Sequence, residues 1–64
     1  MQPHGDRHTG QFRKEVFLAL VTAQDGGTPV KQSRLAVAAD FGISRDEVVR
    51  IEQEGVEAGW PPLG

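Results

Sequence analysis

Apolar residues recur at helical spacing in the first part of the chain that is rich in them. Between Gln11 and Gln24 they fall at i, i+4, i+5 and i+8, with charged residues between them. This spacing predicts an amphipathic helix over 11–24. Asp25, Gly26 and Gly27 end it, because glycine readily takes the left-handed conformation of a helix C-cap. The predicted buried stripe is Phe12, Val16, Phe17, Leu20 and either Ala23 or Gln24.

A second helix is predicted after Thr28 and Pro29. Proline holds φ near the value that a first helical turn needs. The helix therefore begins between Pro29 and Ser33 and ends at Phe41 and Gly42. Its apolar positions are Leu35, Val37, Ala38 and Phe41.

The third helix has the clearest start signal. Ser44 and Glu47 have the spacing of a capping box, in which the serine hydroxyl accepts from the amide of residue 47 and the glutamate reaches back. Gly59 and the two prolines after Trp60 end the helix. We expect Trp60 to fold back over the core, because an indole exposed to water leaves a large apolar surface unburied. The predicted buried face is Val48, Ile51, Gly55 and Val56.

The junction between the second and third helices predicts a helix-turn-helix. Small Ala38 allows the two helices to approach closely, and Gly42 supplies the sharp turn. Ile43 fills the turn, while Val48 and Ile51 bury the third helix against the second. The predicted fold is all-α: a small three-helix domain whose second and third helices form the helix-turn-helix.

Length and composition add limits to this prediction. The chain has 64 residues and no cysteine, so we predict a flexible N-terminal tail over 1–9 and one domain over 10–64. No membrane-spanning run and no secretory signal is visible, so the expected location is cytoplasmic. His4 and His8 have i, i+4 spacing, but no third ligand lies nearby, which favours solvated side chains over a metal site. We expect no cofactor.

The stretch from Ser33 to Val56 resembles region 4 of bacterial sigma factors, the part that reads the −35 promoter element. The resemblance covers about 24 of the 64 residues. It implies a helix-turn-helix fold and a role in DNA binding and transcription regulation, although most of the matching positions build the fold. The matching residues are Val37, Ala38, Phe41, Gly42, Ile43, Ser44, Arg45, Val48, Ile51 and Glu52.

The charge pattern departs from that family. Residues 35–64 carry two arginines and six acidic residues, a net charge of −4, whereas residues 1–34 carry a net charge of +2. Glu47, Glu54 and Glu57 stand where the family has basic residues. Phosphate contacts supply most nonspecific DNA affinity and each needs a cation, so the acidic third helix weakens the expectation of DNA binding. Asp46 and Arg50 also have the spacing of a surface ion pair.

Two functions remain. The first is DNA binding, with duplex DNA held weakly by candidates Ser44, Arg45, Asp46, Val49, Arg50, Lys31 and Arg34. The alternative is a protein-interaction module without DNA binding, which docks on a basic partner or the transcription machinery through Glu47, Glu54, Glu57 and Trp60. The third partner considered is a second copy of this chain, which would form a homodimer. We expect no enzymatic activity, because no nucleophile–base pair, phosphate loop or metal cluster is visible.

Overall fold

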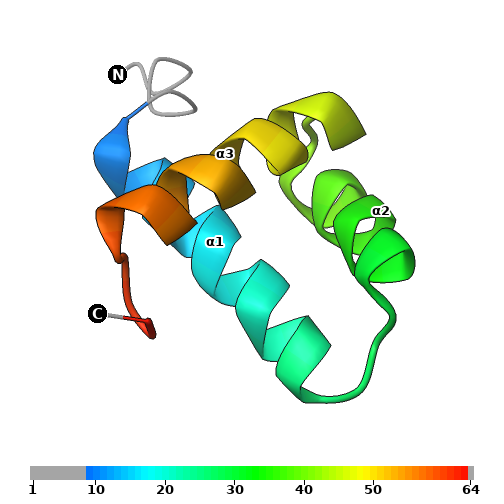
Figure 1. The fold of residues 1–64 in the computed structure, drawn as a ribbon. Coiled ribbons are helices and arrows are strands. Elements are labelled where there is room, and N and C mark those ends of the chain that lie inside the picture. The colour runs from blue at the N-terminus through cyan, green and yellow to red at the C-terminus, as the bar shows by residue number, and fades with distance from the viewer. Residues whose placement is uncertain (1–8, 64) are drawn as a thin grey trace.

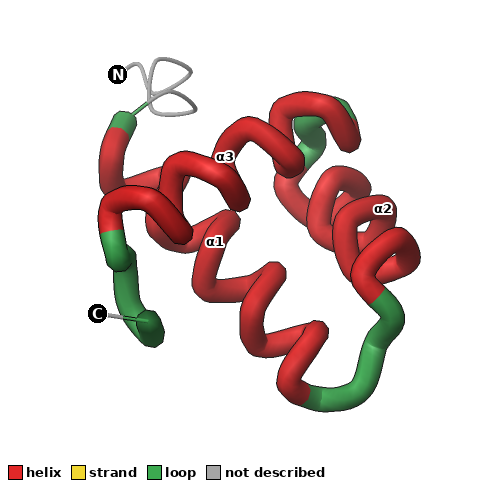
Figure 2. Tube along the Cα trace, in the orientation of Figure 1, coloured by secondary structure: helices red, strands yellow, loops and turns green. Residues whose placement is uncertain are grey.

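A computed structural model describes residues 9–63, and these residues form three helices. They are α1 (Gly10–Asp25), α2 (Val30–Phe41) and α3 (Arg45–Ala58). No strand occurs within these described residues, and each helix packs against the other two (Figures 1 and 2). The predicted all-α, three-helix fold is confirmed. Residues 1–8, which include most of the predicted tail and both histidines, lie outside the described residues.

The helix ends follow from local sequence signals. The Ser44 hydroxyl accepts a hydrogen bond of 3.1 Å from the amide of Glu47, which confirms the serine half of the capping box. Thr9, which the sequence placed in the tail, caps α1 in the same way by accepting from the amide of Phe12. α3 ends at Gly59, whose φ of 67° lies in the left-handed region. The amide of Trp60 then donates to the carbonyl of Gly55 at 3.0 Å, which satisfies a carbonyl of the last turn.

Seven apolar residues, contributed by all three helices, form the buried core. All seven are among the apolar positions predicted from the sequence, and Phe41 and Ile43 pack against them from the end of α2 and the turn that follows. Phe12 and Phe41 meet edge to face, with ring centroids 5.8 Å apart, and so join the start of α1 to the end of α2. The core residues are Val16, Phe17, Leu20, Val37, Ala38, Val48 and Ile51.

Gly55 allows the closest approach between α1 and α3. A Cβ built on Gly55 would lie 2.6 Å from the Cγ of Phe17, so the aromatic ring occupies the space that any other residue would fill. The prediction that Gly55 belongs to the buried face of α3 is thus confirmed. Trp60 also folds back as expected, and its ring meets Phe17 edge to face with centroids 6.0 Å apart.

Two apolar positions of the sequence pattern lie outside the core. Val56, predicted in the buried face of α3, is 58% exposed because it lies at the edge of that face. Leu35 is 50% exposed. This exposure follows from the helical period, because Leu35 lies about 200° around the helix from buried Val37. Within residues 9–63, no helix combines the length and apolar character that crossing a membrane requires.

Candidate nucleic-acid interface

α2, the turn and α3 form the predicted helix-turn-helix. Gly42 has a φ of 68° and closes α2 in the left-handed conformation that favours glycine. The amide of Ile43 donates to the carbonyl of Ala38 at 3.0 Å, so the turn is tied to the last turn of α2. Ala38 is buried, and its small side chain allows α3 to cross close to α2. The turn therefore fixes where α3 begins and which of its faces points outward.

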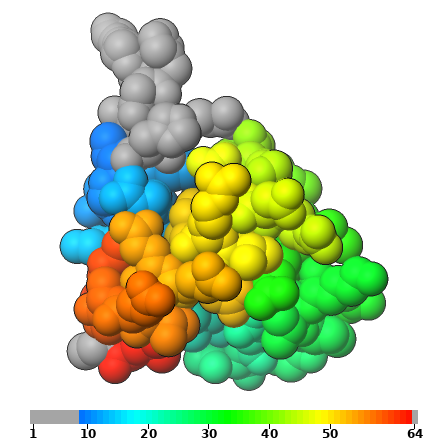
Figure 3. Space-filling view, turned by 45° about the horizontal axis from the view of Figure 1, so that its top comes forward, coloured from blue at the N-terminus to red at the C-terminus, as the bar shows by residue number. Residues whose placement is uncertain are grey.

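The first turns of α3 project from this unit and are accessible. Ser44, Arg45, Asp46 and Arg50 are all exposed, and Arg45 lies 3.4 Å from the carboxylate of Asp46. Within residues 9–63, the structure gives Arg50 no ion pair, so the predicted pair between Arg50 and Asp46 does not form. Figure 3 shows α3, yellow to orange, running across the front of the molecule beside green α2. Four of the seven candidates are thus accessible to solvent.

Two carboxylates of α3 are held by arginines of the other helices. The Nε of Arg34, on α2, donates to Glu52 at 2.9 Å, and the Nε of Arg13, on α1, donates to Glu54 at 3.0 Å. Both pairs are partly exposed. They lower the negative charge of α3 where it crosses its neighbours, but they also engage Arg34, one of the seven candidates for DNA binding. Lys31, exposed in the first turn of α2, has no ion pair within the described residues.

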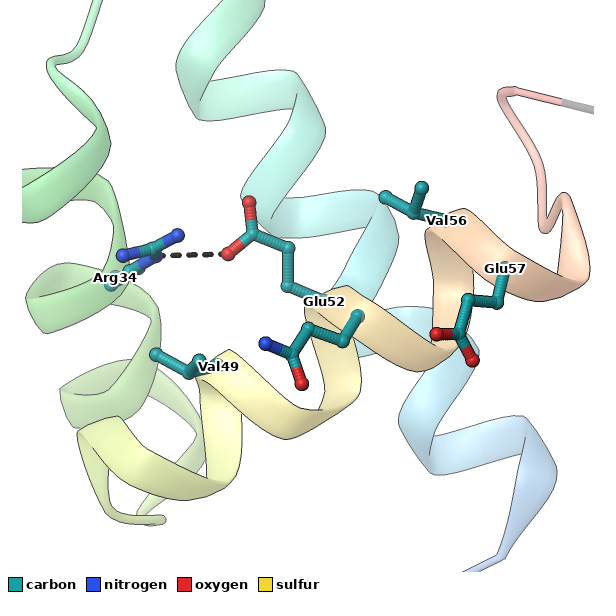
Figure 4. Close-up of a pocket in the computed structure, with 6 residues that line it drawn as sticks. Arg34, Val49, Glu52, Val56 and Glu57 are labelled. Carbon is teal, nitrogen blue, oxygen red and sulfur yellow. Dashed lines mark hydrogen bonds and ion pairs between the residues drawn. The ribbon is translucent and has the colours of Figure 1, made fainter.

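A groove of about 280 Å³ separates α2 from the outer side of α3. Val49 and Val56 line it as apolar residues two turns apart, and the ion pair of Arg34 and Glu52 lies at its α2 side (Figure 4). Val49 is therefore half-buried in this groove and less accessible than the other candidates of α3. The lining is completed by Gln53 and Glu57.

The residues of the alternative, protein-binding prediction do not share one surface. Glu54 faces Arg13 of α1, whereas Glu57 lines the groove beside α2. Glu47 is half-buried at the start of α3, and Trp60 packs on the core. The structure thus separates the acidic residues of α3 into two groups that face different neighbours.

Sequence reasoning missed the contacts that lie far apart along the chain. Arg13 and Glu54 are 41 positions apart, and only the crossing of α1 with α3 brings them together. It also missed Ser33, which is fully buried, donates to the carbonyl of Val30 at 2.7 Å and accepts from Gln24 at 3.1 Å. The i, i+4 spacing of Ser33 with Val37 on α2 was the available signal. Within residues 9–63, no group of three or more His, Asp or Glu residues is arranged to hold a metal ion.

Comparisons with known proteins add no family to this description. No family model, no curated protein and no solved structure matches the chain.

Proposed function

We propose that this chain is a small helix-turn-helix module that binds duplex DNA weakly through the first turns of α3 and takes part in regulating transcription. The observation that carries the proposal is the exposure of Arg45 and Arg50 on a helix whose start is fixed by a left-handed glycine turn. A helix presented in this way fits the major groove, where arginine is suited to guanine.

The internal ion pairs reduce the repulsion expected between the acidic α3 and DNA phosphates. Glu52 and Glu54 are each matched by an arginine within the fold, so they oppose phosphates less than free carboxylates would. Arg50 and Lys31 keep their charges available on the exposed side of α3 and α2, respectively. The proposed role is binding and not catalysis, since none of these groups is paired as a nucleophile and its base.

Fluorescence anisotropy with a labelled random duplex tests the proposal across a salt series. Three cations, Arg45, Arg50 and Lys31, imply a slope of log affinity against log salt of roughly −2 to −3. Arg50→Ala should weaken binding and reduce the slope by about 1. No binding by micromolar protein at about 20 mM salt, where the phosphate contribution is strongest, contradicts the proposal.

A matched pair of neutralising variants separates local charge from net charge. Glu57→Gln and Asp25→Asn each remove one negative charge, but Glu57 lies on α3 and Asp25 at the far end of α1. DNA affinity should rise for Glu57→Gln and change much less for Asp25→Asn, because screening shortens the reach of a charge to about 10 Å. An equal rise in both variants would mean that α3 is not the contacting helix.

The groove beside α3 favours a second candidate, docking of a basic protein segment. Val49 and Val56 offer two apolar contacts, and Glu57 has no ion pair within residues 9–63. A partner segment with an apolar side chain and a lysine or arginine fits that combination. Glu57→Lys should abolish binding of an alternating leucine–lysine peptide, measured by NMR shifts of Val49 and Val56, while Glu15→Lys serves as the matched control on α1. Peptide binding that survives Glu57→Lys rules out this groove.

A further inference from the structure

A second hollow lies on the outer side of α1, away from the proposed DNA-binding surface. Its volume is about 250 Å³. Leu18 lines it from the polar side of α1, where it is 48% exposed, and Pro61 lines it from the segment that follows α3. In Figure 1 this segment, drawn in red, lies beside the first half of α1 and at the opposite end of the molecule from the first turn of α3. The remaining lining residues are Gln11, Lys14 and Glu15.

The apolar part of this surface is exposed to solvent in the folded chain. Leu18 interrupts an otherwise polar helix face, and Leu63, two residues beyond Pro61, is 55% exposed. The chain has a mass of 7.0 kDa and only seven buried hydrophobic residues among those described. A core of that size leaves little margin of stability. Covering Leu18 and Pro61 would therefore add burial that the fold lacks.

The charges around the hollow indicate which partner covers it. Lys14 has no ion pair within residues 9–63, and its neighbour Glu15 accepts a hydrogen bond from Gln11. A partner surface of one charge sign would attract one of these residues and repel the other. A second copy, rotated by 180°, places each Lys14 against the Glu15 of the other copy, so both pairs form together. The small net charge of −2 opposes such an association only weakly.

We propose that two copies of this chain associate about a two-fold axis through the outer face of α1, with Leu18 of each copy seated in the hollow of the other. The contact leaves the first turns of both α3 helices accessible. Where the DNA-binding proposal above holds, the dimer also doubles a footprint of few cations.

Sedimentation equilibrium over a hundredfold range of protein concentration tests the association without DNA. The mass should rise from that of one chain, 7.0 kDa, toward twice that value. Leu18→Glu should keep the chain monomeric while its circular dichroism stays helical. Leu35→Glu is the matched control, since Leu35 is equally exposed but lies on α2 outside the hollow, and it should dimerise like the parent chain. A parent chain that stays monomeric at millimolar concentration overturns the proposal, as does equal dimerisation of both variants.

Charge exchange tests the two-fold pairing itself. Lys14→Glu and Glu15→Lys should each weaken the dimer, because like charges then face each other across the axis. The double exchange should restore it, since the two signs are complementary again. A double variant no stronger than the single ones would rule out this pairing.

The two proposals fail separately. A monomeric parent chain that still binds DNA overturns the dimer alone. A dimeric chain without DNA affinity overturns the DNA-binding proposal alone.

Discussion

At the scale of single residues, Gly55 makes the most specific contact of the fold. Its missing side chain leaves room for the Phe17 ring, and the same ring supports Trp60. Alanine normally favours a helix by about 1 kcal/mol over glycine. Here that preference is outweighed by overlap with a buried ring, because a packed core does not yield easily.

We predict that Gly55→Ala destabilises the domain, at a cost of about 1–3 kcal/mol typical of overpacking. Gly10→Ala is the control, because a Cβ at Gly10 meets nothing within 4 Å. It should leave stability unchanged or raise it slightly. Urea unfolding followed by circular dichroism measures both. Equal midpoints for the two variants would show that the Phe17 contact does not limit this position.

At the scale of elements, short polar signals decide where the helices begin. Ser44 satisfies the amide of Glu47 and so fixes the first turn of α3, the part that carries the proposed DNA contacts. Ser44→Ala should cost about 0.5–2 kcal/mol in unfolding free energy, whereas Ser44→Asp should retain most of the stability. A loss of similar size in both variants would indicate that the hydroxyl does more than cap the helix.

The two ion pairs differ in how strongly they join the helices. The side chains of Arg34 and Glu52 are 32% and 20% exposed, against 31% and 44% for Arg13 and Glu54. Exposed pairs contribute about 0.2–1 kcal/mol. Double-mutant cycles with Ala substitutions should give the larger coupling for Arg34 and Glu52, because water screens that pair less. Both couplings should shrink in 1 M salt. A larger coupling for Arg13 and Glu54 would reverse this ranking.

The elements were more predictable than the contacts between them. Gly42, Ser44 and Gly59 act on neighbours a few residues away, so the sequence pattern located the ends of α2 and α3 closely. The spacing of Val56 fits the apolar stripe of α3 and so predicts burial. Which edge of that stripe is covered depends on how the helices pack, and Val56 is exposed. The engagement of Arg34 by Glu52 likewise depends on the crossing of α2 with α3. Arg45 and Arg50, two of the candidate DNA-binding residues, are exposed on α3.

At the scale of the whole molecule, one small core serves all three helices. Phe17 joins α1 to α3 and to Trp60, the single tryptophan of the chain. We predict that Trp60 fluorescence and helical circular dichroism report the same urea midpoint, because a domain of this size unfolds cooperatively. A fluorescence transition at lower urea would show instead that the segment after α3 detaches before the core unfolds.

The contact of Phe17 with Gly55 also determines how the molecule can move. Sliding α3 along α1 by one residue, about 1.5 Å, would move the gap left by Gly55 away from the Phe17 ring. The contact therefore opposes translation of α3 along α1, a kind of motion by which helical domains commonly switch between states. For the binding proposed above, the position of the α3 backbone is then set before contact, so little backbone entropy would be lost when a partner binds.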